Sequence, residues 1–185
     1  MEDRSLIRSR ILEELDVLAF DPGTTGGMFC MINYGEIEFM PLPVQPGKKL
    51  PRIDYDATFT LLDQSIGLDT QCVIEDVWVR SAQGANSSAK FIETYAAVRG
   101  MMNAISGKPV TTLRPQSWKP QWGIAGKQKD PKGSARYVEK HFPDLVDLMP
   151  RLGKTSKVLG VDINKADAFL IALTPSRMRA AVSGP

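Results

Sequence analysis

Three acidic residues lie beside apolar sequence, where a carboxylate is costly unless it has a chemical task. Asp21 ends the run LAF, Glu75 interrupts the run QCVIEDVWV, and Asp167 comes just before AFLIAL, the most apolar stretch of the chain. Buried carboxylates repel one another and lose their hydration, which costs several kcal/mol unless a cation compensates. If the fold gathers these three side chains, they predict a metal site.

Each acid also has an ordinary structural explanation. Asp21 opens an Asp-Pro-Gly sequence, which is common turn chemistry. Glu75 could project from the solvent face of an edge strand, although its apolar flanks favour a central strand. Asp167 could complete a capping box with Asn164 as the helix N-cap. The order of the acids, one ending the first strand, one in the fourth and one opening the last helix, favours a shared site.

The apolar periodicity predicts the elements that must position these acids. Three successive strands, with a turn at Tyr34-Gly35, precede strands that alternate with helices. We expect strands over 16–21, 27–35, 36–43, 71–79 and 108–115, and helices over 56–66, 88–106, 130–143 and from about 164 to a stop before Pro175. The proline-rich segment 41–56 is expected to be a loop. This order predicts an α/β fold with a mixed sheet, antiparallel first and parallel later.

The composition is typical of one globular domain. The chain has 185 residues, of which 43% are hydrophobic and 24% charged, with a net charge of +2. No apolar run approaches the roughly 20 residues that span a bilayer, and the first 16 residues are charged throughout, so we expect a cytoplasmic protein without a membrane anchor. Cys30 and Cys72 are expected to be reduced core thiols. The predicted organisation is a helical extension over 1–16, one domain over 17–176 and a tail over 177–185.

Positive charge is concentrated in one segment, KPQWGIAGKQKDPKGSARYVEK, which spans residues 119–140. Such a run suits a polyanion, although a solvated loop and helix face would look the same. Trp118 and Trp122 flank its start, where they either anchor the loop on the core or stack on bases.

The acids and their surroundings resemble the RuvC-like Holliday junction resolvases of the ribonuclease H-like superfamily, most of all the bacteriophage members. The resemblance rests on AFDPGTTGG, VIEDVWV, the stretch from Gly84 to Lys127, and KADAFLIAL, so it spans about residues 17–174. The short gap between Asp21 and Gly26 is typical of the phage type. The resemblance implies a five-stranded mixed sheet flanked by helices, in agreement with the pattern of strands and helices.

The resemblance also implies a reaction and its ligands. Asp21, Glu75 and Asp167 would be metal-ligating catalytic residues that hold two Mg²⁺ ions, for which Mn²⁺ would substitute, roughly 4 Å apart. The implied activity is that of a crossover junction endodeoxyribonuclease, which cuts phosphodiesters in pairs and leaves 5′ phosphates. The family's fourth ligand, Asp or His, lies about one helical turn before the last aspartate, where this chain has Asn164. Asn164, the nearby Asp162, or an inactivating substitution at 164 in the chain as studied all remain open.

The same resemblance implies branched DNA, four-way junctions included, as the partner, with a role in recombination and repair. We expect a homodimer formed through the helix over 88–106. The expected phosphate contacts are Arg80, Ser87, Ser88, Lys90, Lys119, Lys127, Lys129, Lys132 and Arg136. Contacts of this kind position DNA without specifying its sequence and make binding depend strongly on salt.

Three other interpretations fit parts of the sequence. A catalytically weakened protein of the same fold could bind branched DNA without cutting it, and another nuclease of the superfamily could act on flaps, forks or RNA hybrids. DPGTTGG also resembles the phosphate loop of the actin-like ATPase superfamily, which would make the chain a phosphotransferase. That superfamily needs more than twice this length and a second glycine-rich phosphate motif, which the sequence lacks.

Overall fold

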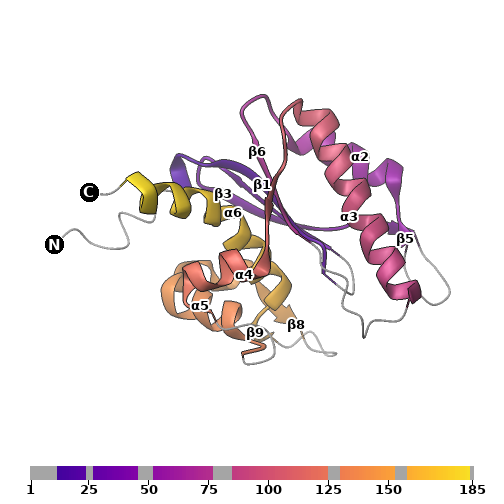
Figure 1. Ribbon diagram of the computed structural model, residues 1–185. Coiled ribbons are helices and arrows are strands. Elements are labelled where there is room, and N and C mark those ends of the chain that lie inside the picture. Colours follow the sequence, from indigo (N-terminus) through magenta and orange to yellow (C-terminus); the bar gives the residue numbers. More distant parts are fainter. Residues whose placement is uncertain are drawn as a thin grey trace.

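The centre of the molecule is a five-stranded sheet in the order β3-β2-β1-β6-β7 (Figure 1). The computed structural model describes residues 12–23, 27–45, 52–76, 85–124, 130–152 and 158–183, without the side chains of 85–87 and 180–183. Strands β1 (Asp16–Asp21), β2 (Met28–Asn33) and β3 (Glu36–Pro41) are antiparallel neighbours. Strands β6 (Gln71–Glu75) and β7 (Thr111–Leu113) continue the sheet parallel to β1. This is the mixed sheet predicted from the sequence.

The turn between β2 and β3 shows why the meander forms where it does. Tyr34 and Gly35 have φ angles of 46° and 95°. Two positive φ values are typical of the tight hairpin turn whose twist matches that of the flanking strands. Glycine adopts such a φ without steric cost, so the predicted Tyr34-Gly35 turn is confirmed.

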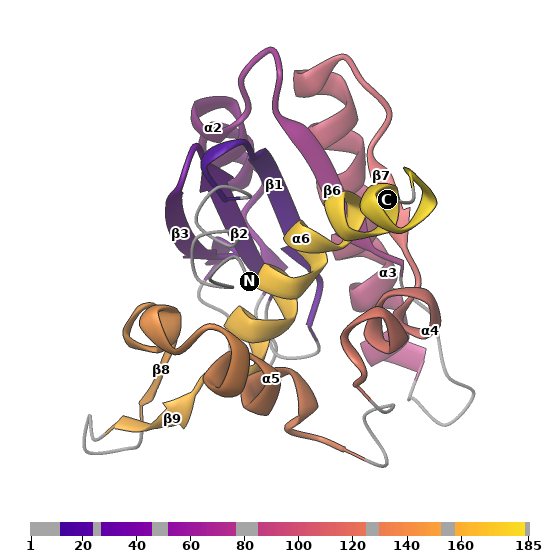
Figure 2. The same cartoon turned by 90° about the vertical axis from the view of Figure 1, so that its left-hand side faces the viewer.

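Helices cover both faces of the sheet. Helices α2 (Tyr55–Ser65) and α3 (Ala85–Ser106) lie on one face, and α6 (Ile163–Ser183) lies on the other (Figures 1 and 2). Alternate residues of β1 belong to different cores: Leu18 and Phe20 pack on the α2/α3 side, whereas Val17 and Ala19 pack on the α6 side. This follows from the two-residue period of a strand, and it decides below which face the acids occupy.

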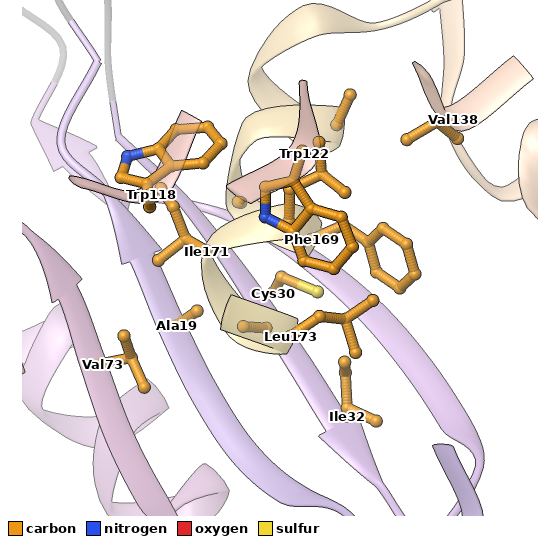
Figure 3. Packing of buried hydrophobic residues seen from close by; sticks show 14 of the residues in the cluster. Ala19, Cys30, Ile32, Val73, Trp118, Trp122, Val138, Phe169, Ile171 and Leu173 are labelled. Atoms are coloured by element: carbon orange, nitrogen blue, oxygen red, sulfur yellow. The ribbon is translucent and has the colours of Figure 1, made fainter. Parts of the chain in front are cut away.

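Helix α6 is buried on all sides over residues 168–175. Figure 3 shows Phe169, Ile171 and Leu173 between the sheet and the two tryptophans. The helix continues through Pro175 to Ser183, so the predicted stop before Pro175 was wrong. A proline inside a helix costs about 3 kcal/mol, and close packing around this helix outweighs that cost.

Several short elements were not predicted. They are β4 (Val44–Gln45), β5 (Arg52–Ile53), α4 (Pro115–Trp118), the 3₁₀ helices η1 (Lys119–Trp122) and η2 (Pro143–Leu148), and the hairpin strands β8 (Pro150–Leu152) and β9 (Val158–Val161). Strands β4 and β5 pair with each other inside the segment predicted as a loop. Helix α5 (Gly133–His141) was predicted, and it ends before Pro143 as expected. Most of the helical extension predicted over 1–16 lies outside the described residues.

Two further expectations concern the core and membranes. Cys30 and Cys72 are free and buried, as the sequence indicated. Within the described ranges, no helix combines the length and apolar character that crossing a bilayer requires.

Candidate metal and nuclease site

Strand register brings Asp21 and Glu75 to the same edge and the same face of the sheet. Ala19 pairs with Val73 and Phe20 with Ile74 in the parallel ladder of β1 and β6, so the next pair in that register is Asp21 and Glu75. Both acids are two residues beyond a member of the α6-side core, Ala19 or Val73, and therefore point toward α6. They lie at the carboxyl ends of parallel strands, where open α/β sheets bind their ligands.

Asp167 joins this pair from helix α6. Asp21 is only 6% exposed, and its carboxylate accepts one hydrogen bond from the backbone N–H of Gly23 at 3.2 Å. Burial raises the pKa of Asp21 well above its ordinary value, and the negative charges of Glu75 and Asp167 raise it further. The Gly23 hydrogen bond and the charge of Lys119 act in the opposite direction. The three predicted acids therefore share one electrostatic environment.

Glu75 is held by a tryptophan. The indole Nε1–H of Trp118, at the end of α4, donates to Glu75 Oε1 at 2.9 Å. Trp118 is fully buried and belongs to the α6-side core, so the packing around its ring holds the Nε1–H donor in place. The interpretation of Trp118 and Trp122 as core anchors is confirmed, because Trp122 is also buried and donates to Thr174 Oγ1 at 3.0 Å.

Asp167 is held by two other groups. The hydroxyl of Ser134, in the first turn of α5, donates to Asp167 Oδ1. The Lys119 ammonium lies 3.5 Å from Asp167 Oδ2, in a pair whose side chains are only 14% and 17% exposed. The same ammonium lies 4.8 Å from the centre of the Trp118 ring, a cation–π contact. The adjacent residues Trp118 and Lys119 therefore contact two of the three acids, Glu75 and Asp167.

The spacing of the acids reflects these partners. Among the described residues, no three carboxylate, imidazole or thiol side chains approach one another closely enough to share one ion. As arranged here, Glu75 and Asp167 are hydrogen-bonded to protein donors, and Lys119 supplies the positive charge beside the acids. Their oxygen atoms are nevertheless the donors that Mg²⁺ and Mn²⁺ prefer.

The candidates for a fourth ligand differ in what they already contact. Asp162 is the N-cap of α6: its Oδ1 accepts from the backbone N–H groups of Asn164 at 2.9 Å and Lys165 at 3.1 Å. Asn164 is exposed in the first turn of the helix. The alternative explanation of Asp167, a capping box with Asn164 as N-cap, is therefore excluded, since Asp162 caps the helix and Asp167 lies five residues after it.

The predicted phosphate contacts fall into three groups. Lys132, the N-cap residue of α5, and Arg136, within the helix, are exposed, and Arg136 also pairs with Asp130. Lys119 lies inside the acidic site, Lys90 is partly buried, and Ser88 is buried at 7% exposure. Arg80, Lys127, Lys129 and the side chain of Ser87 lie outside the described residues.

Trp118 and Ser134 were not recognised from the sequence as partners of the acids. Trp118 lies 43 positions from Glu75, and Ser134 lies 33 positions from Asp167. The available signal was weak: a tryptophan directly before a lysine, and a serine opening a helix in the basic run. Neither pattern specifies a partner without knowledge of how α4 and α5 pack on α6.

The comparisons with known proteins bear on the fold. No family model and no curated protein matches the sequence. Among solved structures, the chain is similar to RuvC of T. thermophilus in complex with a Holliday junction substrate, with a TM-score of 0.57 and 18% identity over 92% of this chain and 97% of that one. A second Thermus thermophilus RuvC structure has a TM-score of 0.47 and 18% identity, covering 88% of this chain and 94% of that one. The first of these similarities, together with the mixed sheet, shows that the chain has a RuvC-like, ribonuclease H-like fold.

The raised pKa of Asp21 gives a prediction about stability. A carboxyl whose pKa is raised by folding destabilises the native state once it ionises, so the penalty is complete above the folded-state pKa and disappears as pH falls toward about 3.9, its value in an unfolded chain. We expect Asp21→Asn to stabilise the protein at pH 8 in EDTA by on the order of 1 kcal/mol, which is about 2–4 °C in a chain of this size. Thermal unfolding should show the gain shrinking between pH 8 and pH 4.

The control for this prediction is Asp63→Asn, which neutralises an exposed carboxylate on α2. Its unfolding midpoint should stay close to that of the parent protein at both pH values. An Asp21→Asn midpoint at or below the parent value at pH 8 would contradict the electrostatic account of the site.

Proposed function

We propose that this protein is a divalent-metal-dependent endonuclease that resolves Holliday junctions and cuts other branched DNA. The observation that carries the proposal is the convergence of Asp21, Glu75 and Asp167 at the carboxyl edge of a RuvC-like sheet. The similar solved structure is a RuvC protein bound to a Holliday junction substrate, which supports branched DNA as the partner. Paired cleavage leaving 5′ phosphates is part of the proposal.

The acidic side chains fit Mg²⁺ or Mn²⁺ by their chemistry. Asp21, Glu75 and Asp167 would hold the cations, two per site, and bound cations would supply an activated water and shield the leaving 3′ oxygen. To hold one ion in common, Glu75 and Asp167 would turn partly from Trp118, Ser134 and Lys119 toward Asp21. Because burial and the neighbouring charges raise the pKa of Asp21, protons compete with cations for its carboxylate, so cation affinity should rise with pH.

The chain's own residues would orient the acids and the DNA. Trp118 positions Glu75, Ser134 positions Asp167, and the Lys119 ammonium would be available to a phosphate oxygen once a cation neutralises Asp167. The exposed cations of α5, together with the other predicted phosphate contacts, would bind the DNA arms.

Pairing of cuts requires two active sites. We propose a homodimer through α3, a 22-residue helix that exposes Ile92 at 48%. A two-fold dimer would match the symmetry of a four-way junction. The bacteriophage type, supported by the short gap from Asp21 to Gly26, and the cytoplasm of a host cell as location belong to the same proposal.

A second candidate function is favoured by the residues before Asp167. Asn164 is neutral and exposed, and Asp162 already caps the helix. A protein without a fourth acidic ligand would bind branched DNA with the same surfaces and cut it weakly or not at all.

The first test is cleavage of a labelled four-way junction, a flap and a duplex in Mg²⁺ or Mn²⁺. We expect symmetric paired nicks in the junction with ligatable 5′ phosphate ends, and no nicks in the duplex. Asp21→Asn and Asp167→Asn should each reduce the rate by at least about 100-fold, since each removes a charged cation ligand, with Asp63→Asn as the control. Intact junctions that remain bound would favour the second candidate function.

The fourth ligand can be identified in the same assay. Asp162→Asn keeps a good N-cap while removing the charge, so its loss of activity would assign the ligand to position 162 and separate that role from capping. Asn164→Asp should raise the rate if position 164 is the ligand. Asp162→Ala removes both the N-cap and the charge. Comparing its activity with that of Asp162→Asn shows how much of the loss comes from a weakened start of α6.

The role of Trp118 is tested against a matched tryptophan. Trp118→Phe and Trp122→Phe each remove one buried indole donor, to Glu75 and to Thr174, and should each cost about 1–3 kcal/mol of unfolding free energy. Only Trp118→Phe should raise the Mn²⁺ concentration needed for half-maximal cleavage and lower kcat by about tenfold or more. The reason is that Glu75, without its indole donor, would be misoriented as a cation ligand. Equal effects of the two variants on the Mn²⁺ dependence would show that Trp118 acts only through packing and does not position Glu75.

A further inference from the structure

The β8–β9 hairpin carries an unusual number of exposed aliphatic side chains. Leu152, Val158 and Leu159 are 60%, 59% and 56% exposed, and Leu148, just before the hairpin, is 45% exposed. Single exposed apolar residues are normal, whereas a group of large ones on one small element usually marks a binding surface. Figures 1 and 2 place the hairpin at the end of the molecule that carries α4 and α5, away from α2.

The pairing of the strands puts two of these side chains together. Leu152 and Val158 are direct partners in the antiparallel ladder, so their side chains lie on one face with Cβ atoms about 5 Å apart. The base of the hairpin is fixed, because Met149 and Val161 are buried and the backbone N–H of Asp162 donates to the Met149 carbonyl at 2.8 Å. An anchored base therefore supports an apolar pair that the core does not cover.

The hairpin is joined directly to the acidic site. Strand β9 ends at Val161, Asp162 caps α6, and Asp167 follows five residues later. At about 1.5 Å per helical residue and about 3.3 Å per strand residue, the chain path from Asp167 to Val158 is roughly 20 Å. The exposed pair is thus within reach of DNA bound at the site.

The charge of the segment points to a polyanion. Residues 149–161 contain Arg151, Lys154 and Lys157 and no acidic residue. Arg151 is exposed next to Leu152, while the acids Asp144 and Asp147 lie on the preceding η2. Apolar side chains bordered by cations are the combination with which proteins wedge between base steps while contacting the flanking phosphates.

We propose that the β8–β9 hairpin is a wedge that places Leu152 and Val158 against unstacked bases at the branch point of the DNA, with Arg151 on a neighbouring phosphate. This inference rests on the proposed function, since it takes branched DNA as the substrate. It adds a structure-selective contact that the phosphate-binding cations do not provide, because base unstacking is easiest at a branch.

The test uses the full chain with a four-way junction carrying 2-aminopurine at the branch point, in EDTA so that the DNA stays intact. Binding should raise the fluorescence several-fold, because an unstacked 2-aminopurine is no longer quenched. In Leu152→Thr/Val158→Thr, which keeps β-forming residues while removing apolar surface, the rise should fall to less than a third. Junction affinity should drop about tenfold and duplex affinity less than twofold.

The matched control is Leu68→Thr, at a side chain 91% exposed in the loop after α2, which should leave both signals unchanged. An unaltered fluorescence rise in the double variant overturns the wedge, as does an equal loss of junction and duplex affinity. A shift from dimer to monomer in sedimentation would instead make the patch an interface between copies and likewise overturn it.

These outcomes are distinguishable from failure of the proposed function. If the parent protein neither prefers junctions over duplex nor cuts them, the proposed function fails and the wedge fails with it. If the parent protein cuts junctions while the double variant keeps its fluorescence rise and selectivity, only the wedge fails. A thermal midpoint within about 2 °C of the parent value would show that the double variant is folded.

Discussion

Repulsion among three carboxylates at one buried edge of the sheet is the constraint on which the rest of the site depends. Asp21 is almost fully buried, and both Glu75 and Asp167 act on it electrostatically. An indole donor, a hydroxyl donor and one ammonium group from the surrounding chain stabilise the carboxylates against this repulsion. Helix α4, η1 and the start of α5 carry these three groups, and together they make up the irregular structure that follows β7.

The same constraint links stability and activity in this fold. A protein selected only for stability would replace one of the acids with an amide or an apolar residue. Under the proposed function, keeping all three becomes favourable when a cation is bound, because ligands that bind the native state stabilise it by mass action. The site is therefore expected to be at its least stable without cations at pH values above the raised pKa of Asp21.

The sequence was sufficient to predict the sheet, and with it the shared face of Asp21 and Glu75, because both depend on short-range patterns. Alternation along β1 and β6 fixes the face of Asp21 and Glu75, and the Tyr34-Gly35 turn fixes the meander. Trp118 and Ser134 could not be assigned, because their contacts depend on how helices pack across more than 30 residues of chain. The end of α6 was mispredicted because local proline chemistry was outweighed by burial of the preceding turns. The hairpin was missed because Gly, Lys and Ser interrupt its apolar residues.

The division of the sheet into two cores has a consequence for how this domain can change over evolutionary time. Because odd and even positions of β1 and β6 contact opposite faces, adding or deleting one residue within either strand would send its acid into the α2/α3 core and Phe20 or Ile74 toward α6. Length changes are therefore tolerable only in connections, whereas the α2/α3 core can exchange its residues with little effect on the acids across the sheet. The α6 side of the sheet therefore carries the three acids, and the α2/α3 side carries none of them.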